Sequence, residues 1–171
     1  MELERVRNAC ETLRDKAMIE MLYSTGCRVT ELERLNITDV DFEKKDVHLF
    51  GKGDKHRTSC LNVRAELALK NYLATRNDDN PALFVSERAP HGRLKKPAIE
   101  KRVRQLGEMS KIGRRVYPHL IRHTTATDGL DRGMPIEEVQ QFLGHVNINT
   151  TMVYAQVSRA NLKRDHRRYI V

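Results

Sequence analysis

The chain has 171 residues, a length that predicts one domain, or one domain with a short appendage, and that allows a hydrophobic core. Its 31 lysine and arginine residues outnumber its 23 acidic residues, and the formal charge of +8 makes nucleic acid the first candidate partner, ahead of a merely soluble basic protein. The three cysteines form no Cys-x-x-Cys pair, which argues against a disulfide framework or structural zinc, and no apolar run approaches the ~20 residues that cross a bilayer. We therefore expect a cytoplasmic protein that does not associate with a membrane.

The first part of the chain predicts two helices around a glycine-containing stop. Residues 2–24 read as a helix with a break near Asp15, and its second half is apolar on nearly all sides, as in a helix at the centre of a domain. Thr25–Cys27 ends this helix, and Thr30–Leu35 predicts another short one. Arg28 therefore stands at the junction of two elements. Taken alone, it is most simply a surface charge at a helix end.

Strand patterns follow over residues 46–61, on either side of the turn Gly51–Asp54. Two glycines beside an aspartate favour a β-hairpin, and Lys52 is expected on its exposed turn. A Gly-Lys-Gly turn also suggests a nucleotide-binding loop, but the glycine that a P-loop needs four residues earlier is missing. We reject that interpretation, and an ordinary solvated lysine remains the simple alternative for Lys52.

The middle of the chain predicts an amphipathic helix over 64–75, a third short strand over 82–86, a basic loop over 88–96 and a helix over 97–110. The first of these helices is expected to bury Leu67, Leu69 and Leu73. Positive charge gathers on the loop and on the second helix, and it fits a DNA contact and a solvated surface about equally well. The cations that we expect to contact DNA are Lys55, Arg57, Arg93, Lys95, Lys96, Arg102 and Arg115.

A helix that begins at Pro118 carries a candidate phosphate site. Proline suits a first helical position, and His119 and Arg122 then share one face of the opening turn. The free backbone N–H groups and the helix dipole at that end favour an anion. His119 and His123 also have a metal-ligand spacing, but Leu120 stands where a metalloprotease helix carries glutamate, so no metal site is expected.

The stretch after this helix supplies a candidate nucleophile. Pro135 begins a second short helix that Gly144 ends, and His145 follows directly after that stop. Tyr154 then lies on what reads as a third helix. A phosphate-binding cluster with a tyrosine hydroxyl nearby suggests nucleophilic chemistry on a phosphodiester. Taken singly, His119 and Tyr154 are each better explained by a structural role.

Taken together, five separated motifs resemble the catalytic domain of tyrosine recombinases, the phage integrase family, over about residues 5 to 160. Their order and spacing fit, which makes the set far more specific than any one of them. The local departures are Cys27, where an apolar residue such as leucine is common, and Asp128 and Asp131 on the helix after Arg122. The resemblance implies an α+β fold that is mainly α-helical, with a small three-stranded antiparallel sheet on one side of a helical core. The motifs are Thr25–Leu32, Gly51–Gly53 with Lys55 and Arg57, His119–Thr124, Leu143–His145 and Tyr154.

The resemblance also implies metal-independent cleavage and rejoining of DNA through a 3′-phosphotyrosyl intermediate, without a cofactor. Two fixed guanidinium groups would replace metal ions at the phosphate. The implied roles are nucleophile for Tyr154, phosphate binding for Arg28 and Arg122, general acid for Lys52, proton acceptance or phosphate binding for His119, and a hydrogen bond to the phosphate for His145.

The whole chain, residues 1–171, is then expected to be the C-terminal catalytic domain of a recombinase encoded by a prokaryotic cell, a phage or another mobile element. The N-terminal domain that clasps DNA in this family is expected to be absent, so the chain would be an excised domain or a short variant. The expected partners are double-stranded DNA and, in the full-length protein, three further protomers on two DNA sites, whereas the isolated domain would be a monomer. The basic tail 158–171 would pack on a neighbouring protomer or fray. Alternatives are a type IB topoisomerase-like enzyme, a catalytically silent DNA-binding module and a metal-dependent nuclease.

Overall fold

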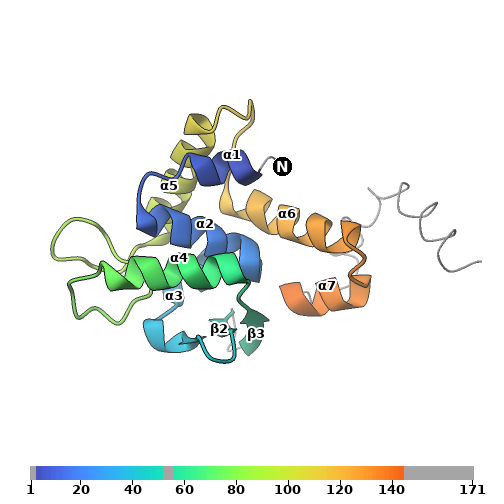
Figure 1. The fold of residues 1–171 in the computed structure, drawn as a ribbon, viewed down its shortest axis with the longest axis horizontal. Helices are drawn as coiled ribbons and strands as arrows, with labels where there is room; N and C mark the ends of the chain where they lie inside the picture. The colour runs from blue at the N-terminus through green and yellow to red at the C-terminus, as the bar shows by residue number, and fades with distance from the viewer. Residues whose placement is uncertain (1–2, 52–55, 145–171) are drawn as a thin grey trace, which may run out of the picture. The chain divides into compact units, whose positions relative to one another are not determined.

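The computed structural model of the protein describes residues 3–51 and 56–144 (Figure 1). It divides into a first unit that ends at Arg122 and a second unit that starts at His123. Most of the described residues are helical, and three strands form an antiparallel sheet. The expected α+β, mainly α-helical fold with a small three-stranded sheet is therefore confirmed.

Two helices open the chain, α1 (Leu3–Asn8) and α2 (Leu13–Thr25). The helix breaks between Asn8 and Leu13, a few residues before the predicted break near Asp15. Thr12 fixes the beginning of α2, because its side chain accepts a hydrogen bond from the Asp15 backbone N–H at 3.1 Å. Gly26 ends α2 in the left-handed conformation, with φ at 55°. The predicted central position of this helix is confirmed, because the side chains of Ala17, Met18, Ile19, Met21 and Leu22 are fully buried.

Helix α4 (Val63–Ala74) runs beside α2, as Figure 1 shows. Its inward face buries Leu69 and Tyr72, in agreement with the predicted amphipathic helix. Leu67, however, is 59% exposed, so its predicted burial is wrong. It lies two residues from Leu69, about 200° around the helix, and therefore faces away from the core.

The sheet has the order β1 (Val40–Asp41), β2 (Asp46–Phe50) and β3 (His56–Cys60), all antiparallel. The hairpin of β2 and β3 is as predicted, with Phe50 opposite His56 at the open end of the described ladder. Residues 52–55 between them lie outside the described residues.

The third strand predicted over residues 82–86 is wrong, since β1 supplies the third strand instead. Residues 82–86 form only isolated bridges, Asn36 to Ala82 and Val85 to Arg93. Their backbone groups bond to two separate loops, with Leu83 N donating to Leu35 O at 2.8 Å and Leu94 N donating to Phe84 O at 2.8 Å. The apolar segment 82–86 is therefore a buried segment that joins two loops through backbone hydrogen bonds.

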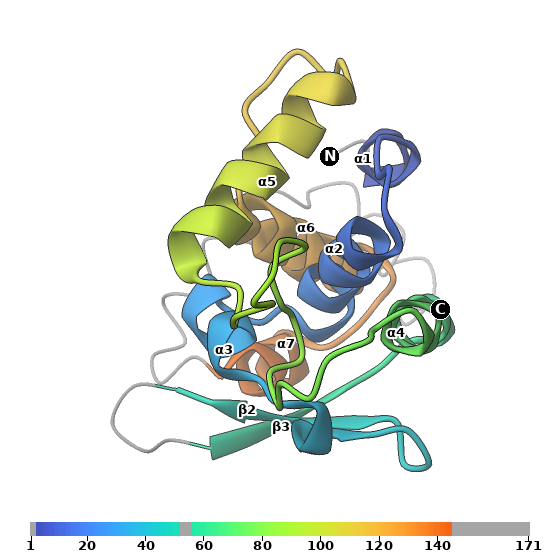
Figure 2. The same ribbon diagram turned by 90° about the vertical axis from the view of Figure 1, so that its left-hand side faces the viewer.

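Two further helices and a 3₁₀ turn belong to the first unit. Helix α3 (Val29–Arg34) follows Gly26 and leads into a 3₁₀ turn, η1 (Ile37–Asp39), while α5 (Lys96–Met109) contacts α3 near its beginning (Figure 2). The predicted short helix after the glycine and the helix over 97–110 are both confirmed to within one residue. Sheet, α1 to α5 and the linking segments share one hydrophobic core in the first unit.

Helix α6 (Pro118–Asp131) begins at the predicted proline, and α7 (Ile136–Leu143) lies in the second unit. Pro135 caps α7 and Gly144 ends it with φ at 64°, as the sequence predicts. Ala126, Val139 and Leu143 form a small core of this unit. Among the helices of the described residues, none is long and apolar enough to cross a membrane.

Candidate phosphate site

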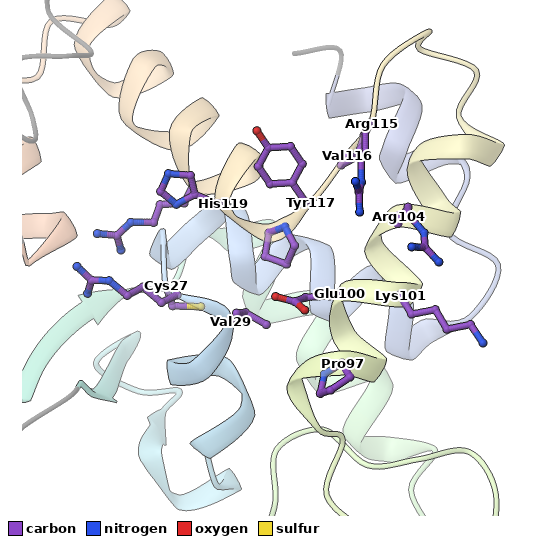
Figure 3. A pocket seen from close by; sticks show the side chains of 13 residues that line it. Cys27, Val29, Pro97, Glu100, Lys101, Arg104, Arg115, Val116, Tyr117 and His119 are labelled. Carbon is purple, nitrogen blue, oxygen red and sulfur yellow. The ribbon is translucent and has the colours of Figure 1, made fainter.

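A cleft of about 600 Å³ lies in the first unit, between the beginning of α3, one face of α5 and the first turn of α6 (Figure 3). Basic groups line it from three sides: Arg28 at the α3 end, Lys101 and Arg104 on α5, and Arg115 before α6. His119 reaches the same cleft from the first turn of α6. The cleft is therefore built to receive a negatively charged group.

Arg28 occupies the N-cap position of α3, directly after the turn that Gly26 makes possible. Its backbone N–H donates to Glu31 Oε2 at 2.7 Å, and its Nη1 donates to Glu31 Oε1 at 3.0 Å. One carboxylate thus holds both the backbone and the guanidinium of Arg28. The side chain remains 45% exposed, so its other N–H groups are accessible to a ligand.

Glu31 is itself buried, with 2% of its surface exposed. Arg57 Nη2 on β3 donates to Glu31 Oε2 at 3.0 Å, in addition to the bonds from Arg28. Burial alone would raise the pKa of Glu31, but the charge of Arg57 and the hydrogen bonds from Arg28 and Arg57 outweigh it and lower that pKa. The carboxylate is therefore ionised at neutral pH.

Arg122 lies on the first turns of α6 and is almost completely buried, with 1% of its surface exposed. Its Nη1 donates to the carbonyl oxygen of Gly26, which places it against the turn that leads to Arg28. Burial, followed by the charges of Arg28 and Arg57, lowers the pKa of Arg122 to about 10. It stays charged at neutral pH, and Arg28, Arg57 and Arg122 thus act together on the carboxylate of Glu31.

This concentration of guanidinium groups favours an anion in the cleft. Negative charge close to a desolvated cation stabilises it. A phosphate suits the place, because its oxygens match the donor fork of a guanidinium. The cluster is therefore a candidate anion site.

The structure brings together three of the six predicted catalytic residues, namely Arg28, His119 and Arg122. His119 is exposed on α6, and the ring of Tyr117 stands beside it in Figure 3. Lys52, His145 and Tyr154, and the predicted DNA contact Lys55, lie outside the described residues.

The other predicted DNA contacts fall into two groups. Lys95, Lys96 and Arg115 are exposed at the edge of the cleft or at the beginning of α5. The remaining three have partners inside the protein: Arg57 pairs with Glu31, Arg93 Nη1 donates to the carbonyl oxygens of Glu33 and Leu35, and Arg102 pairs with Asp15 and Glu11. Their contact with DNA stays a prediction.

Four contributors to the site were missed in the sequence, and three of them are charged. Glu31 has a local signal, because it stands three residues after Arg28, where a helix N-cap often meets a carboxylate. Lys101 and Arg104 add charge on α5 at helical spacing.

Gly107 is the fourth. A Cβ atom there would lie 2.5 Å from the Cβ of Val116, so only glycine lets the segment before α6 approach α5 this closely. A glycine in mid-helix, unfavourable for the helix itself, was its signal. In the same described ranges, no group of three or more His, Cys, Asp or Glu side chains could hold a metal ion.

Comparison with known proteins extends over nearly the whole chain. A family model, described as the phage integrase family, matches residues 1–161. Tyrosine recombinase XerA of Pyrococcus horikoshii is 37% identical over 164 residues, which are 95% of this chain and 57% of that protein. Tyrosine recombinase XerC of Haemophilus ducreyi is 37% identical over 155 residues, 89% of this chain and 50% of the relative. The chain thus spans about half the length of the curated relatives it matches.

Solved structures are similar over the same extent. The crystal structure of XerA recombinase superposes with a TM-score of 0.87 at 35% identity, covering 98% of this chain and 62% of that one. XerH site-specific recombinase, in a post-cleavage complex with a palindromic difH substrate, has a TM-score of 0.80 at 26% identity, covering 96% and 50%.

Proposed function

The chain belongs to the phage integrase family, and from this premise we propose that it is the strand-cleaving domain of a site-specific DNA recombinase. The observation that carries the proposal is the cluster of Arg28, Arg57 and Arg122 around Glu31, in which burial and the charges of Arg28 and Arg57 lower the pKa of Arg122 to about 10. A phosphodiester of duplex DNA is an anion whose oxygens match the donor fork of such guanidinium groups. The named relatives, which are tyrosine recombinases, support the same activity.

The reaction exchanges one phosphoester for another. The Tyr154 hydroxyl oxygen bonds to the scissile phosphorus as the bond from phosphorus to the 5′-oxygen breaks, which leaves a 3′-phosphotyrosyl link and a 5′-hydroxyl. His119 takes the tyrosine proton or holds the phosphate, and Lys52 gives a proton to the leaving 5′-oxygen. His145 hydrogen-bonds a phosphate oxygen. Attack by the 5′-hydroxyl of another strand reverses the step and completes the exchange.

Arg28 and Arg122 stabilise the pentacoordinate state, in which negative charge increases on the non-bridging oxygens. A donor already aimed at that charge is typically worth about 3 kcal/mol of barrier. Arg122 is suited to this role, because burial and the bond to the Gly26 carbonyl hold it in place before DNA binds. Arg28 is held by Glu31 in the same way.

We further propose that residues 1–171 form one catalytic domain acting in the cytoplasm of a prokaryotic cell, since the relatives are bacterial and archaeal proteins. Full exchange requires four strand cleavages, so the complete protein acts as a tetramer on two sites, with the tail 158–171 packing on the next protomer, while the isolated domain is a monomer. Light scattering with and without duplex DNA, on this chain and on a variant truncated after residue 157, measures the assembly. An isolated domain that is already tetrameric would contradict this arrangement.

The nucleophile is tested with a pool of nicked suicide duplexes that have randomised flanks, from which covalent adducts are captured in SDS. The wild-type chain and Tyr169→Phe should form the adduct, and Tyr154→Phe should not. The reverse pattern would move the nucleophile to residue 169. Binding without any adduct would favour a silent DNA-binding module, and relaxation of a supercoiled plasmid without exchange between sites would favour a topoisomerase-like enzyme.

The general acid is tested by replacing the 5′-bridging oxygen with sulfur, because a thiolate leaves without a proton. Lys52→Ala should lose cleavage of ordinary DNA, typically by ~10²–10⁴-fold, and recover it on the sulfur substrate. Lys55→Ala is the control on the same turn and should show no such selective recovery. If Lys52→Ala remains slow on both substrates, Lys52 is not the general acid.

A further inference from the structure

Arg57 is placed for a different role from the DNA contact that its charge first suggests. On β3 the buried Ser59, 1% exposed, shares its face with Arg57, whereas His56 and Thr58 on the other face are exposed. The Arg57 side chain is only 13% exposed. Its guanidinium therefore points into the protein from the hairpin.

Two successive contacts link Arg57 to Arg28: Arg57 contacts Glu31, and Glu31 contacts Arg28. Arg57 Nη2 lies 3.0 Å from Glu31 Oε2, and the same oxygen accepts the Arg28 backbone N–H at 2.7 Å. The other oxygen of Glu31 accepts Arg28 Nη1 at 3.0 Å. The orientation of one carboxylate thus determines both where α3 begins and where the Arg28 guanidinium lies.

That carboxylate needs Arg57 to keep its orientation. Glu31 is 2% exposed, so it has little water to replace a lost donor. Without Arg57 it would turn toward the remaining cations, Arg28 and Arg122, and would draw Arg28 away from its place in the cleft. A buried charge that loses its partner rearranges or loses its proton, and either outcome changes the bond to Arg28.

On the basis of the function proposed above, we propose that Arg57 is a positioning residue, which holds Glu31 and through it fixes Arg28 for the phosphate. Arg57 touches no DNA in this arrangement. In this arrangement the position of strand β3 influences the position of the Arg28 guanidinium through Arg57 and Glu31.

The first experiment separates positioning from DNA contact. Arg57→Ala and Arg57→Lys are compared with Arg7→Ala as a matched control. The Arg7 side chain is 15% exposed, and its Nε lies 2.6 Å from Glu20 Oε1, in a part of the protein that does not line the cleft. The measurements are the dissociation constant and its salt dependence, and the single-turnover rate of adduct formation at saturating DNA, on a duplex selected with the wild-type chain. Thermal melts establish that each variant is folded at the assay temperature.

Positioning predicts a fall in the cleavage rate at saturating DNA on the order of 10²-fold for Arg57→Ala, with the affinity and its salt slope unchanged. Arg57→Lys should recover part of the rate, because it restores one donor to Glu31 without the full fork. Arg7→Ala should cleave like the wild type. A weaker affinity with a salt slope reduced by about 1, and a normal rate at saturation, would instead make Arg57 a phosphate contact and overturn the proposal. Wild-type behaviour of Arg57→Ala in both measurements would overturn it too.

The path through Glu31 is tested by a double-mutant cycle. Once Glu31→Ala has removed the carboxylate, Arg57→Ala should cause no further loss of rate. If the fold-loss of cleavage rate in the double variant equals the product of the two single losses, Arg57 acts independently of Glu31.

A readout that needs no cleavage separates this proposal from the proposed function. The ¹⁵N NMR signal of the Arg28 side chain should shift or broaden in Arg57→Ala and stay unchanged in Arg7→Ala. If the wild-type chain cleaves no duplex but this signal changes, the recombinase function fails and the positioning role stands. If the signal is unchanged in Arg57→Ala, the positioning role fails whatever the activity.

Discussion

Two arginines in the first unit have opposite electrostatic surroundings. Arg102 on α5 meets Asp15 through Nε at 3.0 Å and Nη2 at 2.6 Å, and Glu11 through Nη2 at 3.1 Å. Arg122 on α6 donates to the Gly26 carbonyl, and the nearest charges that act on it include two more guanidinium groups. The hydrogen bond with Asp15 raises the pKa of Arg102 above its ordinary value, whereas burial and like charges lower that of Arg122 to about 10.

The difference separates a structural cation from one for which we propose a function. Carboxylates of the protein satisfy Arg102, which therefore fastens α5 to α2. Arg122 is more deeply buried, and the charges of Arg28 and Arg57 act against its own. A pKa lowered by burial and like charges is typical of functional sites.

Arg122→Met should have the largest effect on activity. Loss of a preorganised donor predicts a fall in the rate of adduct formation of about 10²–10³-fold. Stability should change by less than about 1.5 kcal/mol, because the lost hydrogen bond is offset by the removal of a desolvated charge among like charges. Cleavage assays on a selected duplex and urea unfolding measure the two quantities. A variant that cleaves normally, or one that unfolds as readily as the Arg102 variant below, would remove the distinction.

Arg102→Met should have the largest effect on stability. Asp15 is fully buried, and without its partner the folded protein should lose about 3 kcal/mol of unfolding free energy. Arg104→Met on the same helix is the control, since the Arg104 side chain is 45% exposed and its Nε pairs with Glu108 at a distance of 3.8 Å. Its loss should stay below about 0.5 kcal/mol. Equal urea midpoints for the two variants would show that the pair with Asp15 contributes nothing.

Asp15→Asn sharpens the same comparison through pH. Burial opposes ionisation of Asp15, but the hydrogen bond and charge of Arg102 outweigh it and hold its pKa below the ordinary value of 3.8. The stabilisation is therefore fully present above pH 3.8 and is lost as pH falls through the lowered pKa of the folded state. At pH 7 the wild type should exceed Asp15→Asn by about 2 kcal/mol, and the difference should shrink in acid. A difference independent of pH in urea unfolding would show that the charge of Asp15 is not what stabilises the contact.

Much of the fold follows from local signals. Pro118 begins a helix and Gly26 and Gly144 end helices, as their backbone preferences dictate. The hairpin was equally predictable from its alternating strands and glycine turn. The errors arose where distant segments decide: residues 82–86 have strand character but bond to loops, and Leu67 is apolar but has no core beside it.

The candidate site divides in the same way. The sequence alone identified Arg28, His119 and Arg122 as candidates, because the motifs around them are short and follow a fixed order. Only the tertiary structure decided the partner of each buried charge: Arg57 and Glu31 are 26 positions apart, and Arg102 and Asp15 are 87 apart. An arginine in a sequence has the same charge whether it will meet DNA or a carboxylate, and burial next to a specific partner is what distinguishes the two.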